Sequence, residues 1–214
     1  MKSRARRRPR MGTAIALALS LAASSGCGSS QLLNAWRDPN YSAPPMHNVF
    51  VLVARRDPAR RRLWETAFVD QLKKKGAQAT PSYVYFADDI PDTQAVRDKV
   101  REGGYDGVLV CHEADKEERS HYVPGYTSTV PVTVFQPYWG VYSTVYETVH
   151  HPGYVETETA VQIQTDVWTT GSGGKLVWSA VSETVDPSNA TSFSREVSDL
   201  VVDELAKMRL IPKG

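Results

Sequence analysis

Several short clusters of nucleophilic, acidic and imidazole side chains could do chemistry in principle. Cys111, His112 and Glu113 are the residue types of a thiol nucleophile, its base and an orienting carboxylate. They are consecutive in the sequence, and Cys111 closes the apolar run 107–111, which predicts a buried strand over 107–112. Neighbouring side chains on a strand point to opposite faces, so the three groups cannot converge. The sequence therefore favours Cys111 as a small buried hydrophobe rather than a nucleophile.

Acidic side chains offer a second kind of chemistry, the paired carboxylates of a hydrolase. Asp88 and Asp89 are adjacent, and three more carboxylates follow at Asp115, Glu117 and Glu118. We expect all five in loops, the last three beside Lys116 and Arg119, which indicates solvated charge. A hydrolase that uses Asp88, Asp89 or His112 is kept as an alternative, and convergence of these groups in a closed pocket would support it.

Metal and phosphate sites are not indicated. His150 and His151 are adjacent on a turn expected before residues 152–153, and no Cys or His at ligand spacing accompanies them. Residues 171–175 contain a glycine-rich stretch ending in Lys, but the first glycine and the final Ser or Thr of a phosphate-binding loop are missing. We therefore predict a protein that is not an enzyme, with no catalytic residue, metal or cofactor.

Cys27 is the residue whose surroundings indicate a defined modification. A basic head at 2–10 precedes the apolar run 11–23, and small residues at 24–26 lead to the cysteine. The run is shorter than the roughly 18 residues that span a bilayer, so a cleaved export signal is predicted. The arrangement resembles the bacterial lipoprotein signal, which implies cleavage before Cys27 and lipidation of this residue. The alternative is an ordinary secretory signal that leaves Cys27 as a free thiol.

The net charge of the chain limits the classes of partner that it can bind. The chain has 214 residues and a formal net charge of +1, but six of its 25 Lys and Arg residues lie in the predicted signal. The remainder is mildly acidic, so nucleic-acid binding is not expected.

In the lipoprotein signal, Asp after the cysteine is typical of inner-membrane retention. Gly28 stands there, which implies the outer membrane, facing the periplasm.

The periodicity of the sequence predicts the elements that position these groups. Strands are expected at 47–54, 77–86 and 107–112, with helices at 57–75 and 91–101 between them. A β-hairpin at 155–185 and a helix at 192–209 follow. These elements predict an α/β (α+β) fold: one mixed sheet with two βα units, a long late β-hairpin, and a C-terminal helix packed on the sheet. The expected division is signal peptide 1–26, lipidated tether 27–46 and a single periplasmic domain 47–214.

The segment 121–154 is the most unusual part of the chain, because it is rich in aromatic residues and contains Glu147 as its only Asp, Glu, Lys or Arg. One interpretation is a strand pair around 133–149 whose aromatics pack against the late hairpin. The other is an exposed binding surface, since Tyr and Trp supply rigid contact area at interfaces. The candidate partner-binding residues are Tyr126, Phe135, Tyr138, Trp139, Tyr142 and Tyr146.

Three short motifs carry a family resemblance: residues 35–39 (AWRDP), 105–110 (YDGVLV) and 174–179 (GKLVWS). With them the chain resembles a family of uncharacterised bacterial lipoproteins with an α/β periplasmic domain. Its order of elements is similar to that of penicillin-binding-protein activator lipoproteins, the TolB amino-terminal domain and the curli secretion lipoprotein. The resemblance implies a membrane-anchored envelope lipoprotein that binds or assembles other proteins. The alternative is a lipoprotein that binds peptidoglycan or another glycan.

Overall fold

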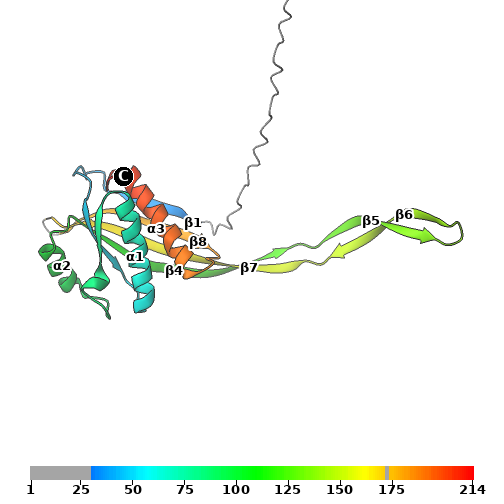
Figure 1. Cartoon of the computed structure of the whole chain (residues 1–214), viewed down its shortest axis with the longest axis horizontal. Coiled ribbons are helices and arrows are strands. Elements are labelled where there is room, and N and C mark those ends of the chain that lie inside the picture. The colour runs from blue at the N-terminus through cyan, green and yellow to red at the C-terminus, as the bar shows by residue number, and fades with distance from the viewer. Residues whose placement is uncertain (1–29, 172–173) are drawn as a thin grey trace, which may run out of the picture.

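The computed structural model of the chain describes residues 30–171 and 174–214. Cys27 and the predicted signal peptide lie outside this range. The described chain has a compact α/β body, from which a long β-ribbon projects (Figure 1). The strands β4 (Gly107–Val123) and β7 (Tyr154–Thr169) run from the body into the ribbon.

Six strands form one mixed sheet in the order β1-β8-β7-β4-β2-β3. β2 lies between β3 and β4 and is parallel to both, whereas the pairs β4–β7, β7–β8 and β8–β1 are antiparallel. The strands of this sheet are β1 (Ser30–Arg37), β2 (Asn48–Val53), β3 (Gln78–Pro81), β4 (Gly107–Val123), β7 (Tyr154–Thr169) and β8 (Leu176–Val185). The other elements are α1 (Pro58–Lys74), the short 3-10 helix η1 (Ser82–Val84), α2 (Thr93–Glu102), β5 (Tyr126–Gln136), β6 (Val141–His151) and α3 (Ala190–Lys207). The predicted fold class is confirmed.

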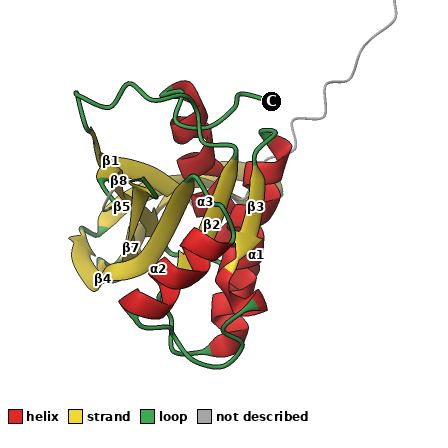
Figure 2. Cartoon of the chain, turned by 90° about the vertical axis from the view of Figure 1, so that its left-hand side faces the viewer, coloured by secondary structure: helices red, strands yellow, loops and turns green. Residues whose placement is uncertain are grey.

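The central strand β2 has an uninterrupted apolar run, residues 49–53, because both of its faces are buried. Alternate residues of a strand face opposite sides, and both sides of β2 are covered. Val49, Val51 and Val53 join the larger core, to which α1 and α3 contribute. Phe50 and Leu52 join a smaller core with Val100 of α2 on the other side. Helices therefore flank the sheet on both faces (Figure 2).

Helix α1 begins and ends at residues that its sequence marks. The Asp57 side chain accepts hydrogen bonds from the backbone N of Ala59 at 2.9 Å and of Arg60 at 3.2 Å, which caps the first turn. Gly76 adopts φ +80° after the last turn, a conformation that favours glycine. Between these ends, apolar residues spaced four apart form the buried stripe Trp64, Phe68 and Leu72. This helix was predicted from the same residues.

The expectation of an aperiodic tether over 27–46 does not hold for residues 30–37. They form β1, which pairs with β8 from Ser30↔Thr184 to Arg37↔Trp178. The segment has few β-branched residues and is followed by prolines, so its local pattern does not indicate a strand. Pairing with the edge of β8 supplies the missing preference, because strand formation depends strongly on the neighbouring strand.

Two further strands differ in length from the expectation. The strand expected over 77–86 ends at Pro81 and gives way to η1. The strand expected over 107–112 continues to Val123 as β4. Asp115, Glu117 and Glu118 therefore lie on a strand, and the prediction that they lie in loops is wrong. Their charge hid the continuation, since acidic residues are depleted in strands, but β7 pairs with β4 along this whole stretch.

Candidate functional site: an exposed aromatic arm

Residues 122–154 form a two-stranded arm that projects from the body (Figure 1). The β4–β7 ladder runs out to Val123↔Tyr154, and the β5–β6 ladder continues it from Tyr126↔His151 to Gln136↔Val141. The two ladders meet at a close crossing of the chain, where a Cβ on Gly125 would lie 2.6 Å from the backbone N of Gly153. Glycine is needed at this junction. Residues 137–140 form the turn at the tip.

The six candidate partner-binding residues all lie on the arm. Tyr138 and Trp139 occupy the tip and are 95% and 82% exposed. Phe135 and Tyr142 lie just behind it on paired strands, with ring centroids 5.2 Å apart. Tyr146 lies midway along β6, and Tyr126 near the base stacks on His151 with centroids 4.4 Å apart. His151 is thus part of a strand and not of the turn expected there.

The two faces of the β5–β6 ribbon differ in chemistry, because side chains alternate along each strand. One face holds the six valines of both strands together with Tyr126 and polar residues at positions 128, 136, 143, 147 and 151. The other holds threonines together with Pro131 and the rings of Phe135, Tyr142 and Tyr146. Most of these side chains are exposed, so the strand pair forms as expected but does not pack against the late hairpin. Of the two interpretations of this segment, the structure supports the exposed surface.

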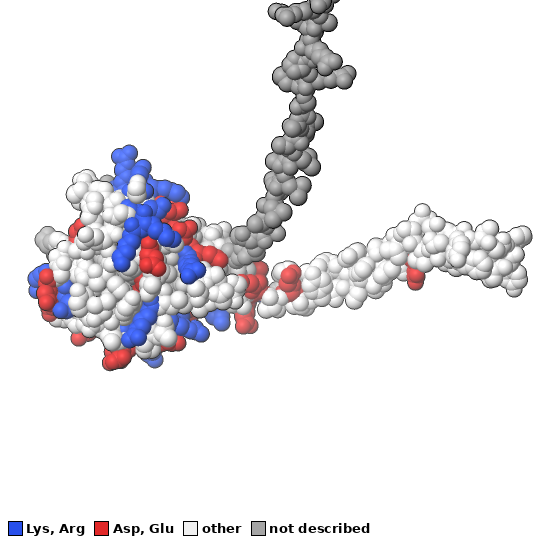
Figure 3. All heavy atoms as spheres, in the orientation of Figure 1, with Lys and Arg blue, Asp and Glu red and all other residues white. Residues whose placement is uncertain are grey.

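The arm is nearly free of charge, in contrast to the body. Figure 3 shows Lys, Arg, Asp and Glu side chains spread over the body and clustered near the base of the arm, whereas the arm beyond is almost bare of them. Glu147 is its only residue of these four types. An uncharged, aromatic and β-branched surface of this kind is typical of a surface that becomes covered by another molecule.

An ion-pair cluster connects the base of the arm to the body. Arg119 of β4 donates to Glu183 of β8 at 2.8 Å and to Glu117 at 3.0 Å, and Gln162 of β7 donates to Glu183 at 3.1 Å. The cluster therefore spans three adjacent strands. The Arg119 hydrogen bond holds the pKa of the Glu183 carboxyl below its usual value. These side chains therefore link β8, a strand of the body, to the two strands that continue into the arm.

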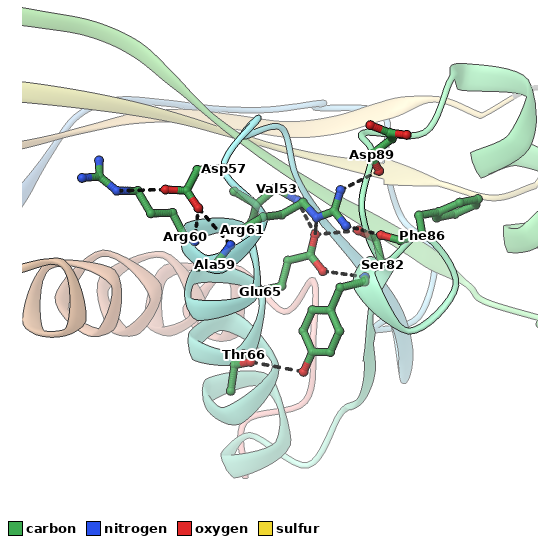
Figure 4. A network of polar contacts seen from close by, with 11 residues as sticks. Val53, Asp57, Ala59, Arg60, Arg61, Glu65, Thr66, Ser82, Phe86 and Asp89 are labelled. Carbon is green, nitrogen blue, oxygen red and sulfur yellow. Dashed lines mark hydrogen bonds and ion pairs between the residues drawn. The ribbon is translucent and has the colours of Figure 1, made fainter.

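A buried polar network joins α1 to the last residue of β2 and to the chain from η1 to Asp89 (Figure 4). Glu65 of α1 is fully buried and accepts hydrogen bonds from Val53 N at 3.1 Å, Ser82 Oγ at 2.6 Å and Tyr83 N at 3.0 Å. Its neighbour Arg61, also fully buried, donates to the carbonyl groups of Phe86 and Asp89.

Burial raises the pKa of Glu65, and the hydrogen bonds that it accepts oppose this shift. The hydrogen bonds of the pair join α1 to the end of β2, to η1 and to the loop between η1 and α2, so the network holds this loop against α1. This network was not predicted from the sequence. Helical spacing could have indicated Arg61, since it precedes Trp64 by three residues on the buried stripe.

The residues considered for catalysis do not converge. Cys111 is buried, and desolvation raises the pKa of its thiol to about 12. Asp88 and Asp89 are exposed in the loop before α2, and His112 lies on β4 opposite Gln164. Within residues 30–171 and 174–214, no cluster of three His, Cys, Asp or Glu side chains could hold a metal ion. No helix of this part of the chain is long and apolar enough to cross a membrane.

Comparison with known proteins gives distant similarities. No protein-family model and no curated protein matches the sequence. Among solved structures, a PelC dodecamer from Paraburkholderia phytofirmans matches with a TM-score of 0.46 and 14% identity over 87% of this chain and 100% of that chain. The lipoprotein GNA1162 from Neisseria meningitidis matches with a TM-score of 0.37 and 13% identity, over 75% and 98% of the two chains. Similarities this distant support no conclusion about this chain.

Proposed function

We propose that the protein is a non-catalytic binding or assembly module of the bacterial cell envelope. In this proposal it is anchored in the outer membrane through lipid on Cys27, and its aromatic arm docks onto another envelope protein in the periplasm. The export signal predicted over residues 1–26, directly before Cys27, supports the location. The observation that carries the function is the arm, whose tip presents Tyr138 and Trp139 almost fully to solvent.

The chemistry of the tip suits docking to a protein. Trp and Tyr are enriched among the residues that dominate binding energy, and each offers a large rigid surface at a small cost in side-chain entropy. The hydrophobic effect disfavours their exposure in the free protein, and binding would remove them from water. Truncation of a dominant aromatic typically costs about 2 kcal/mol or more, which corresponds to roughly 30-fold in affinity. We expect a loss of this order for Trp139→Ala.

The shape of the arm favours a protein over a glycan as the partner. Small-molecule and sugar sites are concave and place a few polar groups around the ligand. Here the aromatic tip is a projecting turn, and the nearby amide of Gln136 is already used as a donor to Ser143 Oγ at 3.1 Å. A projecting ribbon instead matches a groove on a larger partner.

The proposal is tested by co-purification from solubilised membranes with the full chain and two tryptophan variants. Trp139→Ala removes the tip residue, and Trp36→Ala is the matched control, because Trp36 is half exposed on β1 of the body. Envelope proteins retained by the unmodified chain and by Trp36→Ala, but lost with Trp139→Ala, would support the proposal. Partners retained equally by all three would contradict it. Saturable binding of purified wall fragments, lost in Trp139→Ala, would indicate the glycan alternative instead.

A further inference from the structure

We propose that the free edge of β6 pairs with β6 of a second copy of this chain, antiparallel and related by a two-fold axis. The resulting arm sheet has four strands, in the order β5-β6-β6-β5. This proposal concerns the backbone edge of the arm and not the aromatic tip, so it does not depend on the docking proposed above.

The arm has two long unpaired edges within the described residues. On one side, β8 covers β7 only from Ala160 inward. Asp186 closes the ladder there, because Thr159 N donates to its carboxylate at 2.7 Å and its own N donates to Thr159 O at 2.8 Å. From Glu158 outward, no described strand pairs with this side of β7 or with β6. On the other side, β4 beyond Cys111 and all of β5 are equally unpaired.

The two edges are guarded very differently. Folded proteins block exposed strand edges with charged residues and prolines, which prevent pairing with other chains. The edge of β4 and β5 has both, since six of the seven residues 113–119 are charged and Pro131 lies within β5. The other edge carries Glu156 and Glu158 on β7 near the body, but along β6 itself it has no proline and no lysine, and Glu147 is the only acidic residue. The β6 edge is therefore the one left open to pairing.

The composition of β6 also favours pairing. Its sequence VYSTVYETVHH consists mainly of the β-branched and aromatic residues that are enriched in strands. An isolated two-stranded ribbon is marginally stable in water, and three or more strands are needed for independent stability. Addition of a second ribbon satisfies the backbone groups along the edge of β6 and doubles the number of strands.

The strand sequence defines a register for this pairing. In an antiparallel pair, two residues directly opposite each other lie on the same face of the sheet. When a strand pairs with its own copy about a two-fold axis, two such residues must therefore both be even-numbered or both be odd-numbered. Full overlap of residues 141–151 then places Tyr146 opposite Tyr146 of the second copy. Thr144 faces Thr148, and Tyr142 faces His150. Glu147 faces Val145, so the two carboxylates are not directly opposite, which would be unfavourable.

The bodies do not obstruct this arrangement. In the same register Tyr138 at the tip of one arm lies beside Tyr154 of the second copy. The edge of β7 is still unpaired at this position and is first closed at Thr159. The two bodies therefore lie at opposite ends of the shared sheet, where their acidic and basic residues remain in solvent.

The test uses single added cysteines in the full chain and a short thiol crosslinker. Directly opposite Cβ atoms in an antiparallel pair lie about 4.5–5.5 Å apart, so Tyr146→Cys should crosslink to itself across the axis. Thr133→Cys is the matched control, because Thr133 lies on the same face of the ribbon but on β5. The unmodified chain, in which Cys111 is buried, gives the background from the native cysteines.

A covalent dimer with Tyr146→Cys, well above both controls, is the expected result. Equal crosslinking at the two sites, or none above background at position 146, would overturn the proposal. Sedimentation of chains without added cysteine gives a second measurement. We expect a dimer whose association constant falls about fivefold or more in Tyr146→Lys, because two lysines would then face each other. A monomer at all concentrations would also overturn it, whereas the tip-dependent docking could still hold.

Discussion

Replacement of Glu65 by alanine is the sharpest stability test of the body. The carboxylate accepts three hydrogen bonds from Val53, Ser82 and Tyr83, and it lies 4.0 Å from Nε of Arg61. Alanine removes the acceptor from all three donors and leaves the buried guanidinium without its neighbouring carboxylate. If the network is structural, this change must destabilise the fold.

The size of the effect follows from the burial of these groups. A buried donor left without a partner costs about 1–3 kcal/mol, and removal of one member of a buried ion pair costs about 3–5 kcal/mol. These terms overlap, because the same site relaxes around the substitution, so we expect a total loss of about 3–5 kcal/mol. A domain of this kind typically has a free energy of unfolding of about 5–15 kcal/mol. Glu65→Ala should therefore remove a large fraction of it.

The assay is equilibrium unfolding in urea, followed by tryptophan fluorescence and circular dichroism. With a slope of about 2 kcal/mol per molar urea, the midpoint should fall by about 2 M. Glu65→Gln retains one acceptor oxygen and should lose less. Glu102→Ala, at an exposed position on α2, should change stability by about 0.5 kcal/mol at most. An unchanged or higher midpoint for Glu65→Ala would refute the structural role, since functional carboxylates are often retained at the expense of stability.

Four other outcomes are expected. Replacement of residues 124–152 by a two-residue turn should change the free energy of unfolding by about 1 kcal/mol at most in the same urea assay, because no residue of either core lies in the arm. Glu183→Gln should make the free energy of unfolding less dependent on pH on the acid side. The folded state holds the pKa of the Glu183 carboxyl below its value in the unfolded chain. The carboxylate therefore stabilises the fold above the unfolded pKa, and this stabilisation is lost as the pH falls through the folded pKa. In native protein at pH 8, Cys111 should not react with a thiol reagent until the chain is unfolded, because burial raises its pKa to about 12. In cells supplied with a labelled fatty acid, Cys27→Ala should abolish incorporation of the label, and unchanged labelling would contradict lipidation of Cys27.

The body could be predicted from the sequence where local pattern and tertiary packing agree. Helix α1 carries its cap, its apolar stripe and its terminal glycine in the sequence itself, and the strand β2 reads as buried because both of its faces are covered. The strand β1 could not be predicted in the same way. Its residues acquire a strand conformation only by pairing with β8, more than 140 residues further along the chain.

The candidate site was predicted as a group of residues but not as a shape. The aromatic residues between Tyr126 and Tyr146 were identified from composition and low charge. Alternation of Val, Thr and Tyr is equally compatible with a buried sheet face and with an exposed ribbon, so exposure could not be decided from the pattern. The charged stretch of β4 concealed the continuity of the ribbon with the body sheet. Arg61 was missed because a run of three arginines indicates a solvated surface, although helical spacing turns the middle one inward.

The most direct test of the central claim is photo-crosslinking in living cells with a photoreactive residue at position 139. A second chain with the same residue at position 36, an exposed tryptophan on the body, serves as the control. We expect a specific covalent adduct with one envelope protein from position 139 and none from position 36. The absence of an adduct at position 139, or the same set of adducts from both positions, would contradict the claim that the tip of the arm is the docking site.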